Sequence, residues 1–365
     1  MASASELSSD CYYVWHPVLL PELYHNRLNP LNSLFVEYII CLEFPIRRNG
    51  MKVCVVGASN VDIIARSFTP IVDTDSNIGR IDKAPGGVGR NIAFALNALG
   101  FEVSMLTALA DDEYGRLIAD GMKKAGIGLP VKPFDGEDDR TGVYCCVMDG
   151  DGSLVCAVND MKISDRLSPE LVMEHKDTLE ACDYVVFEAN LPIETIKALS
   201  EIDAKLVADC VSVVKTPRLN EVLESLYLLK ANFSEACALA EVEGVEPDEE
   251  GIQTVMEALV AKGLRRAIIS LGRKGAFCYE VSGTGTRGVD APVLDNLNVV
   301  STNGCGDVLL SGFLRALAEG CPIEDALYYG QAASGINAES MEAVSPDLSF
   351  DNVKKKVEEN YEQLS

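Results

Sequence analysis

Short apolar runs alternate with amphipathic segments along the chain from Met51 onward. Between the runs, apolar residues recur at helical spacing, as in residues 252–262. This alternation predicts an α/β fold with a doubly wound, mainly parallel sheet and helices on both of its faces. The runs that we expect to form buried strands are residues 184–187, 206–208, 226–229 and 267–271.

One stretch departs from this alternation. Residues 141–158, TGVYCCVMDGDGSLVCAV, hold two strand-like runs around a turn sequence at 149–152, which predicts a β-hairpin. With a second strand-like region, it would form a small β-sheet lid from about residues 62–84 and 141–160. We expect this lid to cover a pocket, and an alternative interpretation is an edge through which two copies form a homodimer.

The first fifty residues differ from the remainder. They contain the single Trp, two of the three His residues and no Lys, and their apolar clusters lack a clear period. We interpret residues 1–50 as an atypical, poorly ordered extension, with an organelle transit peptide as the alternative. No stretch has the roughly 18 consecutive apolar residues of a membrane span.

Composition excludes several classes of partner and site. The chain of 365 residues has 56 acidic and 31 basic residues, a formal net charge of −25, which disfavours nucleic acids and anionic membranes. Its 12 Cys residues include no C-x-x-C pair, so we expect free thiols and a cytoplasmic location. The three His residues show no zinc-ligand spacing and no sign of a catalytic triad.

Two glycine-rich segments precede helical patterns: PGGVGRNIAFALNALG at 85–100 and VVSTNGCGDVLLSG at 299–312. The free amides at a helix start form a natural anion site, and glycines let a phosphate approach them closely. Asp307 beside such a site could accept a proton from a hydroxyl that attacks the bound phosphoryl group. The alternative is that Asp307 only caps the helix.

Other glycine-based phosphate motifs do not match. The chain has no G-x-x-x-x-G-K-[ST] sequence, which excludes a Walker-type P-loop. Ile92 occupies the position where the dinucleotide-binding fingerprint has Gly or Ala, so a nicotinamide enzyme is a weak alternative.

Taken together, these segments resemble the ribokinase-like, or phosphofructokinase-B, carbohydrate kinases. GGVGRN is similar to the first signature of that family, and NGCGD is similar to its G-A-G-D signature, with Cys305 in place of Ala. NVD at 60–62, NFSE at 232–235 and SLG at 270–272 match further motifs in the family's order. The resemblance covers Met51 to about residue 360 and implies a single kinase domain at 51–365 with ATP and Mg²⁺ as cofactors.

The resemblance also implies roles for individual residues. The catalytic residues would be Asp307, as base, with Gly304, Cys305 and Gly306 as the anion hole. The residues that bind a small-molecule sugar or nucleoside substrate would be Asn60, Asp62, Gly86, Gly87, Asn91 and Asn190. The nucleotide would contact Asn232, Ser270, Gly272 and Asn337, and Glu235 and Asn232 would organise Mg²⁺. The family also implies a homodimer formed through the lid.

Three segments narrow the range of substrates that we expect. GGVGRN, VNDM at 158–161 and DCVSVVKT at 209–216 together resemble pseudouridine kinases, which phosphorylate the 5′-hydroxyl of that nucleoside. Val88 stands where ribokinases carry Lys, and Asn190 stands near the position of a ribokinase Glu, so free ribose is less well supported. Asn303 replaces the usual hydroxyl residue before Gly304, which counts against a K⁺ site there, so dependence on K⁺ is an open alternative. Adenosine, ribose, fructose and ketodeoxygluconate are alternative substrates, and a catalytically silent sugar- or nucleotide-binding regulator is an alternative of another class.

Overall fold

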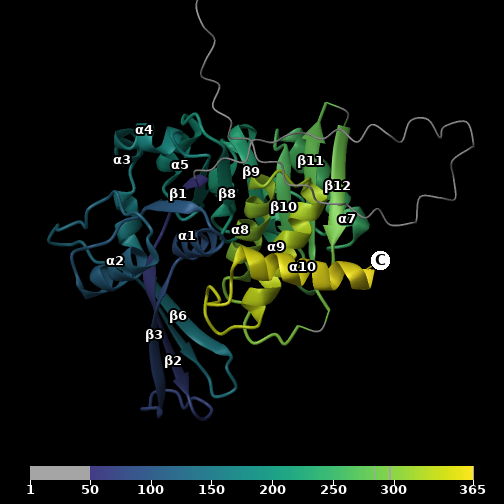
Figure 1. Ribbon diagram of the computed structural model, residues 1–365. Helices are drawn as coiled ribbons and strands as arrows, with labels where there is room; N and C mark the ends of the chain where they lie inside the picture. The colour runs from purple at the N-terminus through teal and green to yellow at the C-terminus, as the bar shows by residue number, and fades with distance from the viewer. Residues whose placement is uncertain (1–49, 284, 296, 365) are drawn as a thin grey trace, which may run out of the picture.

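A central eight-stranded sheet organises the molecule (Figure 1). The computed structural model describes residues 50–364, except 284 and 296, so the predicted N-terminal extension lies outside the described residues. The first six strands below run parallel, and the last two are antiparallel. From one edge to the other, the strands are β4 (Glu102–Leu106), β1 (Lys52–Val56), β7 (Tyr184–Glu188), β8 (Leu206–Asp209), β9 (Leu226–Asn232), β10 (Arg266–Ser270), β11 (Ala276–Ser282) and β12 (Gly285–Ala291).

Helices cover both faces of this sheet because its strands are apolar on both sides. In β1, Val53 and Val55 pack into one hydrophobic cluster, whereas Cys54 and Val56 pack into another on the opposite face. The first cluster includes α1 (Val88–Ala98), α2 (Glu113–Ala125), α8 (Cys305–Ala318) and α9 (Ile323–Ala338). The second includes α3 (Pro169–Glu174), α4 (Lys176–Glu180), α5 (Ile193–Ser200), α6 (Phe233–Ala240) and α7 (Glu249–Ala261). Outside them, α10 (Phe350–Leu364) packs on α9.

A second, four-stranded sheet projects from the main body (Figure 1). It consists of β3 (Gly79–Gly86), β2 (Asn60–Ser67), β5 (Gly142–Met148) and β6 (Leu154–Asp160), in that order. The hairpin β5–β6 turns at Asp149–Gly152, where the backbone of Gly152 donates to Asp149. The predicted fold class is therefore confirmed: a mainly parallel sheet with helices on both faces and a small second sheet.

Local signals set the element ends. Helix α7 begins at Glu249, before the predicted residue 252, because the Asp248 side chain caps it by accepting from the Gly251 amide at 2.9 Å. Four 3₁₀ helices complete the described elements: η2 (Lys162–Arg166), η3 (Thr216–Leu219), η4 (Leu223–Ser225) and η5 (Gly272–Lys274). No helix in the described part of the chain is long and apolar enough to cross a bilayer.

Candidate active site

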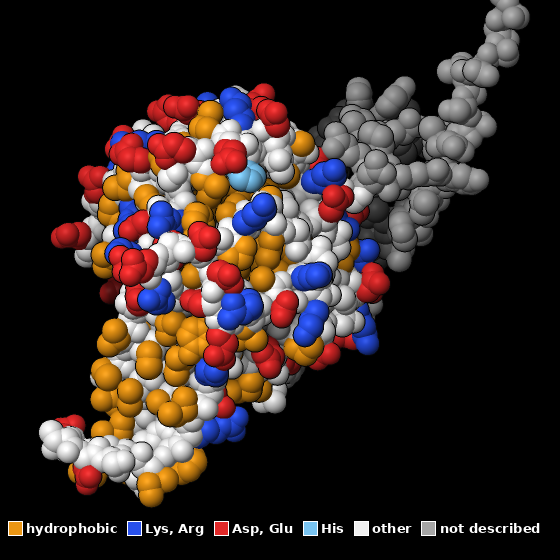
Figure 2. All heavy atoms as spheres, turned by 90° about the vertical axis from the view of Figure 1, so that its left-hand side faces the viewer, with side chains coloured by type: hydrophobic (Ala, Val, Ile, Leu, Met, Phe, Trp, Pro, Cys, Tyr) orange, Lys and Arg blue, Asp and Glu red, His pale blue; other side chains and the backbone are white. Residues whose placement is uncertain are grey.

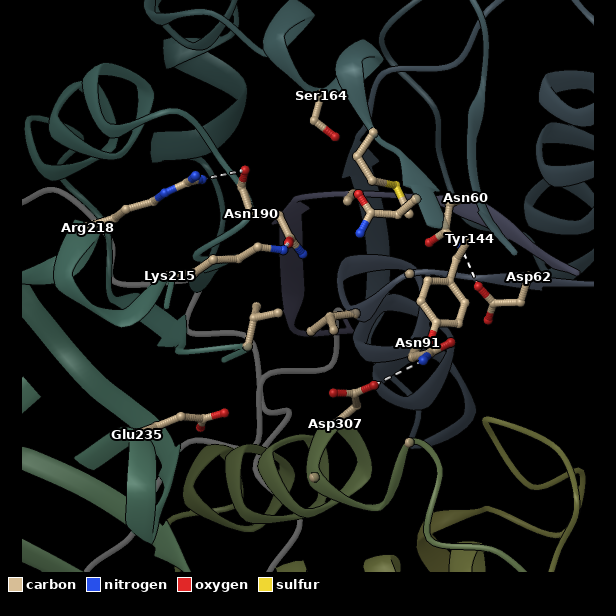
Figure 3. A pocket seen from close by; sticks show the side chains of 18 of the residues that line it. Asn60, Asp62, Asn91, Tyr144, Ser164, Asn190, Lys215, Arg218, Glu235 and Asp307 are labelled. Carbon is tan, nitrogen blue, oxygen red and sulfur yellow. Dashed lines mark hydrogen bonds between the residues drawn. The ribbon is translucent and has the colours of Figure 1, made fainter. Parts of the chain in front are cut away.

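A pocket of about 960 Å³ lies where the main sheet meets the lid. Residues that follow parallel strands β1, β7 and β8 reach it, namely Ala58, Asn190 and Val211, and Asn232 reaches it from the end of β9. Tyr144 and Asn159 line it from the lid (Figure 3). The carboxyl ends of parallel strands are where α/β proteins form their ligand sites.

The N-terminus of α8 opens into this pocket. Gly304 is its N-cap, no side chain caps the helix, and Gly304, Gly306 and Asp307 all line the pocket. Gly304 has φ 72°, and a Cβ there would lie 1.9 Å from the carbonyl oxygen of Ala343. A left-handed backbone and this close approach both require glycine. The helix start, which no side chain caps, therefore presents a positive dipole end and backbone amides to the pocket, as an anion site needs, while the Cys305 amide donates to the carbonyl oxygen of Thr302 at 3.3 Å.

Asp307 lies in the first turn of α8 and is 7% exposed. Its Oδ2 accepts a hydrogen bond from Asn91 Nδ2 at 3.0 Å (Figure 3). Asn91 comes from α1, which packs on α8, so the fold joins residues 216 positions apart. Burial raises the pKa of the Asp307 carboxyl to about 7, and the Asp209 carboxylate adds to the rise, while Lys230 and Asn91 oppose it. A carboxyl with such a pKa can act as a general base near neutral pH.

The lid contributes a second carboxyl. Asn60 Nδ2 donates to Asp62 Oδ1 at 2.6 Å, and both side chains line the pocket together with Gly87. Gly86 lies beside them, because a Cβ on it would lie 2.2 Å from Asp62 Oδ2. Burial raises the pKa of Asp62 above its ordinary value. This amide and carboxyl pair offers hydrogen bonds suited to the hydroxyls of a neutral polyol.

Asn232 and Glu235 form a capping box at the start of α6. Asn232 Oδ1 accepts from the Glu235 amide at 2.9 Å, and Glu235 Oε2 accepts from the Asn232 amide at 2.7 Å. Both residues also line the pocket, and burial raises the pKa of the Glu235 carboxyl. Within the described residues, no group of three or more His, Cys, Asp and Glu side chains could hold a metal ion by itself. A divalent cation bound here would take its remaining ligands from water or from a phosphate group, which is how Mg²⁺ sites are commonly completed.

A polar cluster from the segments that follow β7 and β8 lines the pocket opposite α8. Lys215 Nζ donates to Asn190 Oδ1, and Arg218 donates to the carbonyl oxygens of residues 189, 190 and 191. Arg218 thereby fixes the loop that presents Asn190 (Figure 3). Asn190 was predicted from the sequence, whereas Arg218 was not.

Five predicted site residues lie outside the residues that line the pocket, and one of them is Gly86, which lies beside Asp62. Ser270 ends β10 and pairs in register with Asn232, so it lies at the same sheet edge. Gly272 lies two residues further on, and a Cβ built on it would meet nothing within 4 Å. Asn337 is fully buried. Its side chain links two backbone segments, because it donates to the carbonyl oxygen of Asn303 at 2.9 Å and accepts from the Ser345 amide. Cys305 directs its thiol to carbonyl oxygens of the chain.

A row of charged residues at the floor of the pocket was not predicted from the sequence. Glu188, Asp209 and Lys230 occupy matching register positions on β7, β8 and β9. Glu188 accepts from the amides of Ala58 and Asn190, at 2.7 and 2.6 Å, and burial raises its pKa to about 7. The available signal was a charged residue at or near the end of three otherwise apolar strand segments: YVVFE, LVAD and LYLLK.

Comparisons with known proteins agree with this geometry. The family model of the pfkB family carbohydrate kinases matches residues 51–349. Pseudouridine kinase of Escherichia coli is 28% identical over 84% of this chain and 96% of its own length. A carbohydrate kinase structure from Agrobacterium tumefaciens has a TM-score of 0.72 at 30% identity, covering 84% of this chain and 97% of its own. Arabidopsis thaliana ribokinase, solved with ribose and ATP, has a TM-score of 0.74 at 20% identity, with 85% and 99% covered.

Proposed function

Because the chain belongs to the pfkB family of carbohydrate kinases, whose members use ATP, we propose that it phosphorylates the 5′-hydroxyl of pseudouridine. One observation carries the choice of substrate. The three segments that resemble pseudouridine kinases are far apart in the sequence, yet all line one pocket, through Val88 and Asn91, Asn159 and Met161, and Val211 and Lys215. The 28% identity to the pseudouridine kinase of Escherichia coli supports the same choice.

The proposed reaction uses few protein groups. Asp62 and Asn60 hold the ribose hydroxyls, and the first turn of α8 holds the γ-phosphoryl group. The substrate oxygen forms a bond to the γ-phosphorus as the bond from that phosphorus to the β–γ bridging oxygen breaks. The electron pair leaves with ADP, and the hydroxyl proton goes to the Asp307 carboxylate. Alignment and charge stabilisation are the main demands of phosphoryl transfer, and these groups supply both.

Glu235 and Asn232 are suited to hold a Mg²⁺ ion that arrives with ATP. Burial disfavours the charge of Glu235, and a neighbouring cation would stabilise that charge. The ion would neutralise negative charge on the phosphates. Dependence on K⁺ stays a prediction, which a comparison of turnover in K⁺ and Na⁺ buffers tests.

We expect the rate to rise with pH through an inflection near 7. The base must be deprotonated to accept the substrate proton, and burial raises the pKa of Asp307 to about 7. Activity is therefore lost as pH falls below this value and gained as pH rises above it. The kcat/KM profile between pH 5.5 and 9 measures the inflection. Glu188→Gln removes the other carboxyl of similar pKa. The inflection should persist in that variant and move downward, because the Glu188 carboxylate raises the pKa of Asp307; its disappearance would remove Asp307 from this role.

Turnover across a substrate panel tests the proposed function. ADP release should be at least about tenfold more efficient in kcat/KM with pseudouridine than with uridine, adenosine, ribose, fructose or ketodeoxygluconate. Preference for another member of the panel would keep the kinase and replace the substrate. ATP binding without turnover on any of them would favour the silent regulator. We expect the reaction in the cytoplasm, where the ten cysteines that are free in the described residues stay reduced.

We also propose a homodimer formed through the lid. Side chains alternate between the two faces of a strand, so Asp62, Tyr144 and Asn159 line the pocket from one face. Ile81 and Val158 belong to the opposite face, and each is 71% exposed. Apolar side chains gather on the projecting lid (Figure 2). An exposed apolar sheet face of this kind is typical of an interaction surface.

Val158→Lys should convert the proposed dimer to a monomer, because it places a charge in the centre of an apolar interface. Light scattering after gel filtration at micromolar concentration should show the mass falling by half. Val214→Lys is the matched control, since Val214 is 88% exposed but lies outside the lid, and it should leave the mass unchanged. A wild-type mass near 39 kDa would contradict the dimer.

A further inference from the structure

Lys230 is a buried lysine directly below the anion site. Its side chain is 10% exposed and lines the pocket. Its Nζ would lie 2.7 Å from a Cβ built on Gly306, which places the ammonium group against the first turn of α8. A buried ammonium is costly unless it is paired. Its position and charge are those of an additional ligand for whatever anion the helix start holds.

The partner of this lysine is a buried carboxylate. Asp209 Oδ2 lies 2.9 Å from Lys230 Nζ, and Asp209 is 1% exposed. Among the described residues, Asp209 is the one acid within ion-pair distance of this ammonium. An ammonium group has three donors, so a single carboxylate oxygen leaves capacity for a ligand in the pocket.

Asp209 also holds a strained turn at the pocket wall. Its Oδ1 accepts from the amide of Val211 at 2.8 Å, and Val211 has φ 63°, which a β-branched residue rarely adopts. The amide of Ser212 donates to the carbonyl oxygen of Cys210 at 2.7 Å, which closes the turn. Strained backbone of this kind gathers at functional sites. One carboxylate thus fixes both the lysine and a pocket-lining residue.

We propose that Lys230 is a further catalytic residue, which contacts the transferred phosphoryl group from below the start of α8, and that Asp209 is its positioning residue. This inference rests on the proposed kinase function and adds a cationic ligand to the anion hole. The ammonium stabilises the negative charge that spreads over the phosphoryl oxygens during transfer. Asp209 keeps it protonated and aimed at the pocket.

Lys230 and Asp209 also change the pKa of Asp307 through their charges. The charged groups of the elements around Asp307 are Arg90 on α1, Glu188 on β7, Asp209 on β8, Lys230 on β9 and Glu235 on α6. Lys230 lowers the pKa of Asp307, whereas Asp209 raises it. Removing Lys230 should therefore move the inflection of the pH profile upward, and removing the charge of Asp209 should move it downward. These shifts test whether both charges act on Asp307 in the pocket; contact with the phosphoryl group is tested by the rate and by the nucleotide affinity.

Lys230→Met should lower kcat by about 100-fold, the size seen when one group that stabilises transition-state charge is removed. The KM for the nucleoside should change less than about threefold, because the lysine contacts the phosphoryl group. Lys230→Arg should recover part of the rate. Lys262→Met is the matched control, since Lys262 pairs with Glu241 at the exposed end of α7, and it should retain full activity.

The double variant Asp209→Asn with Lys230→Met separates function from folding. The introduced asparagine keeps an oxygen for the Val211 amide, and the double variant leaves no unpaired buried charge at these two positions. We expect its Tm to return toward the wild-type value while kcat stays about 100-fold low. Recovery of both Tm and kcat, or a Lys230→Met variant within about threefold of the wild-type kcat, would overturn the proposal.

Nucleotide affinity gives a readout that does not depend on turnover. Lys230→Met should weaken binding of a non-hydrolysable ATP analogue about tenfold more than binding of ADP, measured by calorimetry. Equal loss for both nucleotides would refute contact with the terminal phosphoryl group. If wild-type protein turns over no substrate, the proposed function fails; wild-type turnover with an unaffected Lys230→Met variant overturns this inference alone.

Discussion

Asp307→Asn is expected to lower kcat by about 10³-fold while nucleotide affinity stays within about threefold of the wild-type value. Asn has nearly the shape of Asp and its oxygen can still accept from Asn91 Nδ2, so the local packing should be kept. It cannot take a proton at neutral pH, and a positioned general base contributes between about 10² and 10⁴ in rate. Single-turnover kinetics with pseudouridine measures the rate, and calorimetry with ADP measures the affinity.

Asp248→Asn is the control for this substitution. Asp248 caps α7 through the Gly251 amide, and Asn caps helices as well as Asp does. This variant changes an acid at another helix start without touching the pocket, so kcat should not change. An Asp307→Asn enzyme with more than about a tenth of the wild-type rate would remove Asp307 as the base.

Gly304→Ala is expected to cause the second large loss, in both stability and turnover. A side chain at φ 72° costs about 1–2 kcal/mol, and its Cβ would lie 1.9 Å from the Ala343 carbonyl oxygen, so the backbone must move. That movement displaces the amides that we propose hold the phosphoryl group. We expect kcat to fall at least about 100-fold and Tm to fall by several degrees, measured by steady-state assay and thermal unfolding.

Gly126→Ala measures the part of this loss of stability that comes from the left-handed backbone alone. Gly126 has φ 78° at the C-terminal end of α2, and a Cβ on it would meet nothing within 4 Å. Gly126 shares the left-handed conformation of Gly304, but a Cβ on it would make no clash and it does not line the pocket. It should lose a similar increment of stability from the backbone alone while keeping full kcat. Loss of activity in Gly126→Ala to the same extent would attribute the Gly304→Ala effect to stability.

The family resemblance and the fold class predicted from the sequence are confirmed, and the roles of the individual site residues stay predictions. Glycines before an apolar helical pattern are a local signal, which is why Gly304 was recognised as a helix start. Asn337 shows the limit of assignment by resemblance: the resemblance implied a contact with the nucleotide, whereas its amide group bonds to backbone atoms at residues 303 and 345. Partners of that kind depend on how the chain packs.

By itself, the sequence determined the alternation of strands and helices, the hairpin of the lid and the uncapped glycine start of α8, because each follows from spacing within a few residues. Only the tertiary structure decided which side chains meet. Asn91 reaches Asp307 because α1 packs on α8, and Glu188, Asp209 and Lys230 form a row because β7, β8 and β9 pair in one register. Register and helix packing arise from contacts between distant segments, which a local pattern does not encode.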